Sequence, residues 1–190
     1  MGLILASQSP RRRKLLDLLQ IDYRVKPAVI DEAITITEPE VLVKTLALNK
    51  ACKVAKTYPE DYILAADTVV CLREKILGKP KNAEEAYASL SLLSGKTHQV
   101  LTGVALIGLK ADFKKVITVM TEVDFREIRP GEIDYYIKTK EPFDKAGGYG
   151  IQGFAGVFVT AIRGSYHNVV GLPLAQTAKL LGEAGLYSMW

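Results

Sequence analysis

Hydrophobic residues follow two kinds of pattern along this chain. In three long segments they recur every three or four residues, which predicts amphipathic helices, and in three others they form continuous or alternating runs, which predict strands. The helical segments are 38–58, 82–94 and 173–183, and the strand segments are 62–72, 100–109 and 116–128. The segment 62–72 is the most continuously apolar, so we expect it at the centre of a sheet with both faces covered.

The strand segments 100–109 and 116–128 are separated by a short, mostly charged stretch, 110–115. This spacing predicts an antiparallel pair and therefore a mixed sheet. No repeat or linker divides the chain, and 190 residues with 48% hydrophobic residues suffice for one sizeable core. We therefore expect one α/β domain, residues 1–190, built on a curved mixed β-sheet flanked by helices.

A further helix is predicted to begin at Pro10, directly after a short apolar run. Proline is favoured in the first helical turn, and Ser9 before it is a favoured N-cap. The residues from Arg11 to Lys14 are all cations, and they lie in the turn where the helix dipole is positive. Cations oppose the dipole there unless an anion lies between them, so the start of this helix is a candidate anion site.

Helical spacing separates these cations into two groups. Arg12 lies three and four residues before the first two leucines of the buried stripe, at the open end of that stripe. Arg13 lies four residues before Asp17, and a solvated ion pair accounts for it. We assign Arg11 and Arg12 to the anion. A solvated basic face is the alternative, and it fits Arg13 and Lys14 better.

Carboxylates stand out at two places. Asp67 interrupts the apolar segment 62–72, where burying a carboxylate costs roughly several kcal/mol unless it meets a cation, a metal or several hydrogen-bond donors. Asp67 is therefore the first candidate for catalysis. Asp31 and Glu32 also follow an apolar run, at a strand end of the kind where α/β proteins bind ligands. From spacing alone, an ordinary solvated turn is the slightly favoured interpretation of these two.

Two lysines and one histidine occupy unusual positions. Lys50 falls within the apolar face of segment 38–58, where it either extends to the edge of that face or meets an anion, and the pattern leaves both open. Lys79 lies between Gly78 and Pro80 on a stiff turn. His98 begins a strand, which favours a hydrogen-bonded structural histidine over a ligand.

A glycine-rich stretch from Gly148 to Gly153 matches the pattern G-x-G-x-x-G. We reject a dinucleotide site, because that motif needs a strand before it and a helix after it, whereas a polar loop precedes this stretch and 154–162 is predicted as a strand. The glycines instead indicate a backbone that turns sharply or approaches a ligand closely. Gln152 is displayed on this loop.

Composition narrows the classes of function. The net charge of +4 is modest and much of the surplus lies at the first helix, which suits a small polyanion better than a nucleic acid. No apolar run reaches the ~18 residues of a membrane helix and the N-terminus lacks signal-peptide features, so we expect a cytoplasmic protein. Cys52 and Cys71 lie in different elements without a nearby His or Cys, which argues against a zinc site.

The candidates together fit a nucleoside triphosphate. Cations and a helix N-terminus would hold the phosphates, while carboxylates would bind a divalent ion and activate a water for attack on phosphorus. The cations are Arg11, Arg12, Lys50 and Lys79, the carboxylates are Glu32 and Asp67, and the amide is Gln152.

The opening motif, Ala6-Ser7-x-Ser9-Pro10-Arg11-Arg12, resembles the signature of the Maf-like nucleoside triphosphate pyrophosphatases. Further segments resemble this family in the same order along the chain, and they cover nearly its whole length. They are Asp31-Glu32, Asn49-Lys50-Ala51, Ala65 to Val70, Gly78-Lys79-Pro80, Leu93 to His98, Asp144 to Gly147, and Gly164 to Pro173. The resemblance implies an α/β fold of the Maf/ITPase-like kind, with two lobes and a cleft.

The resemblance also implies an activity, namely hydrolysis of nucleoside triphosphates to the monophosphate and pyrophosphate with a divalent metal, Mg²⁺ or Mn²⁺. Asp67 matches the proton acceptor and Glu32 matches a pocket position, and these two carboxylates are the ones we assign to the metal. Arg12, Thr68 and Gln152 match positions linked to substrate choice, and Lys50 and Lys79 match pocket positions. The stretch 149–153 resembles the branch that acts on dTTP and UTP, in a house-cleaning role that can extend to modified pyrimidine nucleotides.

Two other classes of function stay open. A nucleotide-sensing regulator of cell division or septum formation, without significant turnover, would have the same sequence features. A nucleic-acid module would need a basic groove with stacking aromatic residues, and we expect no specific nucleic-acid or membrane partner. The sequence is compatible with a homodimer.

Overall fold

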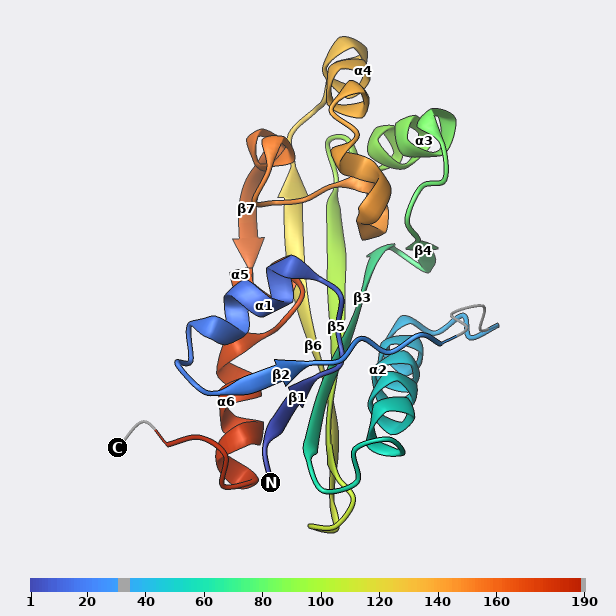
Figure 1. Ribbon diagram of the computed structural model, residues 1–190. Helices are drawn as coiled ribbons and strands as arrows, with labels where there is room; N and C mark the ends of the chain where they lie inside the picture. Colours follow the sequence, from blue (N-terminus) through green and yellow to red (C-terminus); the bar gives the residue numbers. More distant parts are fainter. Residues whose placement is uncertain (31–34, 189–190) are drawn as a thin grey trace. The chain divides into compact units, whose positions relative to one another are not determined.

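The computed structural model describes residues 1–30 and 35–188, so the predicted site residue Glu32 lies outside the described residues. Helices and strands are mixed along the chain, as the hydrophobic pattern predicts (Figure 1). The strands are β1 (Leu3–Leu5), β2 (Tyr23–Val25), β3 (Tyr62–Leu72), β4 (Lys75–Leu77), β5 (Thr97–Gly108), β6 (Phe113–Phe125) and β7 (Val159–Arg163). The α-helices are α1 (Pro10–Asp17), α2 (Pro39–Ala55), α3 (Ala83–Leu93), α4 (Pro130–Lys138), α5 (Tyr166–Val170) and α6 (Leu174–Glu183).

The described strands form one seven-stranded sheet with the order β2-β1-β3-β5-β6-β7, and β4 also pairs with β3. β1 runs parallel to both β2 and β3, whereas β4 is antiparallel to β3 and β7 is antiparallel to β6. The connection between β5 and β6 is too short for a parallel crossover, so these two strands form the predicted hairpin. The predicted mixed α/β sheet is confirmed, with β3 in its interior.

The chain divides into two compact units, to which β3, β5 and β6 each contribute residues. Unit 1 comprises Met1–Asp67, Thr102–Val119 and Gly171–Trp190, and unit 2 comprises Thr68–Leu101 and Met120–Val170. The family resemblance implies two lobes, and the division into two compact units is in keeping with that description.

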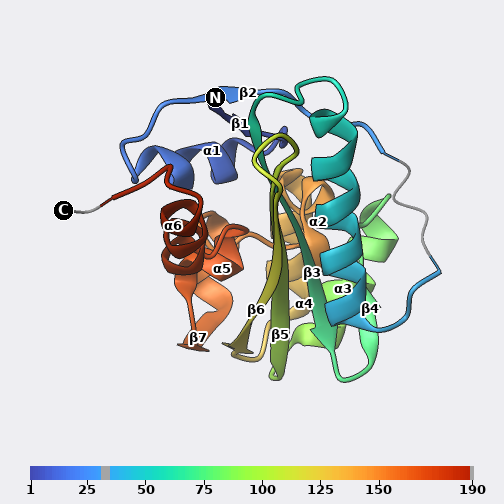
Figure 2. The ribbon, with the colours of Figure 1, turned by 90° about the horizontal axis from the view of Figure 1, so that it is seen from below.

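Unit 1 is a sheet covered on both faces. One face of α2 carries small residues, including Ala47 and Ala51, that pack on Ile4, Ile63 and Ala105 of the strands. Figure 2 shows α2 on one side of β3 and β5, and α1 and α6 on the other side. This double cover explains why residues 62–66 of β3 are buried without alternation.

Unit 2 has its own core, in which aromatic residues are prominent. Phe125 and Phe158 make edge-to-face contact, as do Tyr136 and Phe158, and α3 and α4 cover this cluster. Three short 3₁₀ segments join α4 to β7. They are η1 (Glu141–Asp144), η2 (Ala146–Gly148) and η3 (Phe154–Phe158).

One predicted element is wrong in part. The segment 154–162 was predicted as a strand, but only Val159–Arg163 is a strand, and Phe154–Phe158 forms the 3₁₀ turn η3. The helical turn brings Phe154 and Phe158 together on Tyr136, with ring centroids 5.8–6.0 Å apart, and this aromatic packing outweighs the strand propensity. Among the described residues, no helix is long and apolar enough to cross a membrane.

Candidate functional site

The first helix begins where the sequence predicts. Ser9 is the N-cap of α1, and its hydroxyl accepts a hydrogen bond from the backbone N–H of Arg12 at 3.4 Å. Arg11 and Arg12 are half-buried, whereas Arg13 and Lys14 are exposed. This difference agrees with the separation of the four cations by helical spacing.

The Arg12 side chain is oriented by two partners within unit 1. Its Nε donates to the carbonyl of Gly171 at 2.7 Å, and its guanidinium also donates to the hydroxyl of Ser7 at 3.4 Å. Ser7 is buried and accepts a further hydrogen bond from the backbone N–H of Ser9. Sequence reasoning missed these two roles, although Ser7 and Gly171 both lie inside the motifs that carry the family resemblance.

Asp67 and Lys50 form an ion pair inside unit 1. Lys50 Nζ of α2 lies 2.6 Å from Asp67 Oδ1 of β3, and the two side chains are only 12% and 11% exposed. The pair decides between the two interpretations of Lys50, because its ammonium meets a carboxylate instead of extending to the edge. It also shows what offsets the cost of burying Asp67 in an apolar strand.

Asp67 lies beyond the end of the neighbouring strand. Leu5, the last residue of β1, pairs with Leu64 of β3, and the N–H of Ala6 continues the ladder to the carbonyl of Leu64. Asp67 is three residues further along β3, about 10 Å past this position at the rise of an extended strand. It therefore lies on the carboxyl side of the parallel strands β1 and β2, where α/β sheets bind ligands.

A divalent metal is compatible with the carboxylate of Asp67. Mg²⁺ binds oxygen ligands, and it commonly takes one or two carboxylates together with substrate phosphates and waters. A carboxylate offers about four acceptor positions on its two oxygens, so accepting from Lys50 leaves capacity for a metal or a water. The described residues hold no cluster of three His, Cys, Asp or Glu residues that could bind a metal.

Three other predicted site residues belong to unit 2. Thr68 is half-buried and follows Asp67 directly in β3. Lys79 is exposed on the turn between β4 and α3, where it lines a surface hollow of about 320 Å³ with Pro80 and Ser89. Gln152 is exposed on the turn between η2 and η3.

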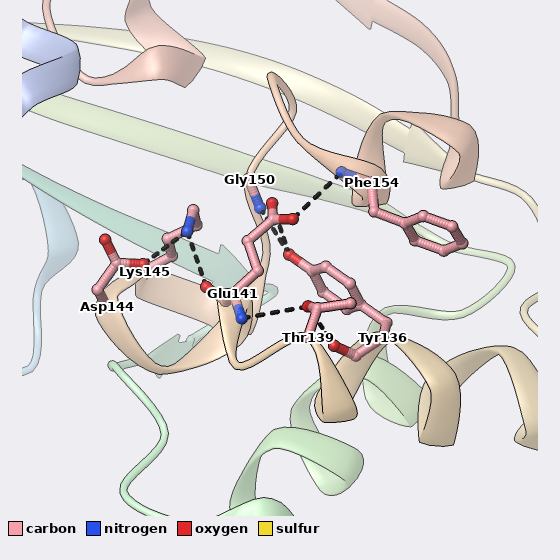
Figure 3. A network of polar contacts seen from close by, with 7 residues as sticks. All are labelled: Tyr136, Thr139, Glu141, Asp144, Lys145, Gly150 and Phe154. Atoms are coloured by element: carbon pink, nitrogen blue, oxygen red, sulfur yellow. Dashed lines mark hydrogen bonds and ion pairs between the residues drawn. The ribbon is translucent and has the colours of Figure 1, made fainter.

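The glycines before and around Gln152 do two different things. Gly147 and Gly148 have φ of 68° and 73°, so the backbone turns there through the left-handed region. Gly150 and Gly153 instead make room, because a Cβ on them would lie 2.5 Å from the Lys145 side chain and 1.9 Å from the Glu141 carboxylate, respectively. Figure 3 shows Glu141 and Lys145 beside this turn.

His98 is a buried structural residue, as the sequence predicts. Its Nε2 lies 2.7 Å from the Tyr149 hydroxyl, and its ring packs edge-on against Phe125. Burial lowers the pKa of His98 to about 4, so the ring is neutral at pH 7.

Comparison with known proteins finds similarity along nearly the entire chain. Residues 2–184 match the family described as Maf-like protein. The chain is 50% identical over 183 residues to a dTTP/UTP pyrophosphatase of Bacillus cytotoxicus, covering 95% of this chain and 94% of that protein. It is 49% identical over 189 residues to a dTTP/UTP pyrophosphatase of Myxococcus xanthus, covering 99% and 95%. A solved structure titled nucleoside-triphosphatase / dITP/XTP pyrophosphatase, from Mycobacterium abscessus, aligns over 100% of both chains with 15% identity and a TM-score of 0.48.

Proposed function

Because the chain belongs to the Maf-like protein family, we propose that it hydrolyses dTTP and UTP to the monophosphate and pyrophosphate. Relatives that are about half identical over nearly their full length carry this activity in their names. The structural observation that supports the proposal most directly is the buried carboxylate of Asp67, held by Lys50 on the carboxyl side of the parallel strands. The reaction would serve a house-cleaning role, which can extend to modified pyrimidine nucleotides.

Asp67 is the general base of the proposed reaction. It accepts a proton from a water that attacks phosphorus as the bond between the α- and β-phosphates breaks, which releases the monophosphate and pyrophosphate. The Lys50 ammonium fixes one oxygen of Asp67 at 2.6 Å. Fixing the carboxylate in this way orients the other acceptor positions before substrate binds, so less ordering is needed in the transition state. Thr68, the next residue in β3, is assigned to substrate choice.

Arg11 and Arg12 bind the phosphate groups. The hydrogen bonds from Arg12 to the Gly171 carbonyl and to Ser7 hold its side chain in one direction, and the start of α1 adds the positive end of the helix dipole. Lys79 supplies a further cation from a turn that Pro80 stiffens.

A divalent cation, Mg²⁺ or Mn²⁺, would neutralise phosphate charge and polarise the phosphorus–oxygen bonds. Asp67 is the described residue that would hold it, and Glu32, which the sequence also assigns to the metal, lies outside the described residues.

Gln152 reads the base. A carboxamide presents one acceptor and one donor side by side, which match the N3–H and a neighbouring carbonyl of uracil and thymine. Its exposed position on a turn leaves this edge accessible to a ligand.

The proposal is tested by incubating the purified protein with dTTP, UTP, CTP and GTP, with Mg²⁺ or with EDTA, and separating the products. We expect dTMP and UMP with pyrophosphate, at rates that exceed those for CTP and GTP, and no turnover in EDTA. Release of diphosphates with inorganic phosphate would contradict the proposed bond cleavage. Binding of dTTP without any turnover would support the nucleotide-sensing regulator instead.

A further inference from the structure

The turn that carries Gln152 is held at both of its ends by one carboxylate. The backbone N–H of Gly150 donates to the Tyr136 hydroxyl at 3.3 Å, and that hydroxyl donates to Glu141 Oε1 at 3.1 Å. The backbone N–H of Phe154 donates to Glu141 Oε2 at 3.2 Å. Glu141 therefore closes a loop of contacts around residues 150–154, and Figure 3 shows this arrangement.

Glu141 is itself firmly placed. Its backbone N–H donates to Thr139 Oγ1 at 3.2 Å, and its carbonyl accepts from Lys145 Nζ at 2.7 Å. Lys145 Nζ also pairs with Asp144 at 2.5 Å. The backbone of Glu141 is therefore held in place, and its carboxylate in turn holds the backbone of residues 150–154.

Gly153 shows how closely the carboxylate and the turn fit. Its φ of −103° lies outside the left-handed region, so a positive φ is not what requires glycine at this position. A Cβ would instead lie 1.9 Å from Glu141 Oε1, which is far inside van der Waals contact. A side chain at position 153 would therefore overlap with the Glu141 carboxylate, which explains why this position holds a glycine.

We propose that Glu141 is a positioning residue for nucleotide selectivity, which holds the backbone of the turn 150–154 and thereby the position from which the Gln152 amide reaches the base. The inference rests on the proposed function, in which Gln152 reads the base. The amide of Gln152 can make two hydrogen bonds to a base only from a limited range of backbone positions, so selectivity for uracil and thymine depends on where the turn is held. A turn fixed before binding also avoids the cost of ordering it around the ligand.

Glu141→Gln tests this with little change of shape. Both carboxylate oxygens accept hydrogen bonds, whereas the amide nitrogen of glutamine only donates, so it cannot accept from the Tyr136 hydroxyl or from the Phe154 N–H, and one of these two hydrogen bonds is lost. We expect the KM for UTP and dTTP to rise about tenfold, the size of one lost hydrogen bond, and the preference over CTP to fall by a similar factor. The kcat should stay within about twofold, because Asp67 is unchanged.

Glu132→Gln is the matched control. Glu132 is also a carboxylate of unit 2 that accepts from a backbone N–H, that of Arg129, and from a side chain, that of Arg126. It caps α4 rather than the Gln152 turn. A purely structural role of Glu141 would make the two variants alike, with lower Tm and an unchanged order of kcat/KM among UTP, dTTP, CTP and GTP.

A double variant tests whether Glu141 affects selectivity through Gln152. In a Gln152→Ala background, Glu141→Gln should change neither KM nor the preference further. If Glu141→Gln does not fold, Tyr136→Phe removes only the hydroxyl that links Gly150 to Glu141, and it should shift the preference in the same direction. The inference is overturned if these variants lower Tm but keep the wild-type KM and preference. If the wild type shows no turnover at all, the proposed function fails, and UTP and CTP binding affinities of the same variants then decide the inference.

Discussion

Replacing Asp67 by asparagine removes the charge of the proposed base and little else. The two side chains have the same shape, and the amide oxygen of asparagine can still accept from Lys50 Nζ, which lies 2.6 Å from Oδ1. The backbone of β3 is unaffected, because Asp67 lies within a strand of eleven residues that are mostly buried. The variant therefore separates the chemistry of the carboxylate from its packing.

We expect this variant to change both kcat and the free energy of unfolding. Loss of a general base lowers kcat by about 10²-fold or more, which corresponds to about 2.7 kcal/mol of transition-state stabilisation. Loss of one charge from a largely buried hydrogen bond costs about 2 kcal/mol of stability, which for a chain of this size lowers Tm by about 5 °C. The KM for dTTP should change little, because Arg11 and Arg12 retain their charges.

Asp61→Asn is the control for the loss of an ion-paired carboxylate. Asp61 also belongs to unit 1, where it accepts from the side chain of Arg24 and from the backbone N–H of Gly2. The assay is steady-state pyrophosphate release from dTTP with Mg²⁺, together with thermal unfolding of each variant. We expect both variants to lose stability and only Asp67→Asn to lose turnover. Near-normal kcat in Asp67→Asn, or an equal loss in Asp61→Asn, would refute the assignment.

Three further predictions concern other residues. Arg12→Ala should lower kcat/KM for dTTP by an amount that corresponds to about 1.5–3 kcal/mol, whereas Arg13→Ala, at an exposed position, should change kcat/KM little. Equal losses of kcat/KM in the two variants would contradict the assignment from helix geometry. Gln152→Glu cannot donate to a base carbonyl and should cost UTP and dTTP about 2 kcal/mol of kcat/KM, whereas an unchanged preference among the four triphosphates would exclude base reading. The pKa of His98 falls from 6.5 to about 4 on burial, so the unfolded state binds more protons below pH 6.5 and stability falls as the pH drops toward 4. The loss between pH 7 and 4.5 should be about 2 kcal/mol by urea unfolding, and His98→Leu should lack that part of the pH dependence.

Signals carried by neighbouring residues were sufficient to predict much of the fold. Ser9 and Pro10 fix the start of α1 because capping and the proline ring act within one turn. The continuous apolar run predicts β3, Tyr62–Leu72, with the bounds that the structure shows. Asp67 stands out within it because a buried carboxylate is costly, and this argument needs no knowledge of the partner.

Contacts between distant segments could not be predicted in the same way. The pattern placed Lys50 on an apolar face, but only the packing of α2 on the sheet shows that it meets Asp67. Arg12 and its carbonyl partner Gly171 are separated by most of the chain, and no local pattern connects them. The helix α5 and the turn η3 are five residues each, too short to display a helical period, so they were not predicted.

Two ionisable residues within buried strands, His98 and Asp67, show how the hydrogen-bond partner of a buried residue bears on its role. His98 in β5 meets the neutral hydroxyl of Tyr149, so burial drives it to the neutral form, and the pair packs as part of an aromatic cluster. Asp67 in β3 meets the ammonium of Lys50, which offsets the burial of a charge and keeps a carboxylate with further acceptor positions in place. The neutral pair of His98 and Tyr149 brings no charge into the core, whereas an ion pair at the carboxyl side of parallel strands retains capacity to bind a proton or a metal. Burial in an apolar strand singles out both residues, and the partner then separates them, because Asp67 keeps a charged carboxylate and His98 becomes a neutral residue of the core.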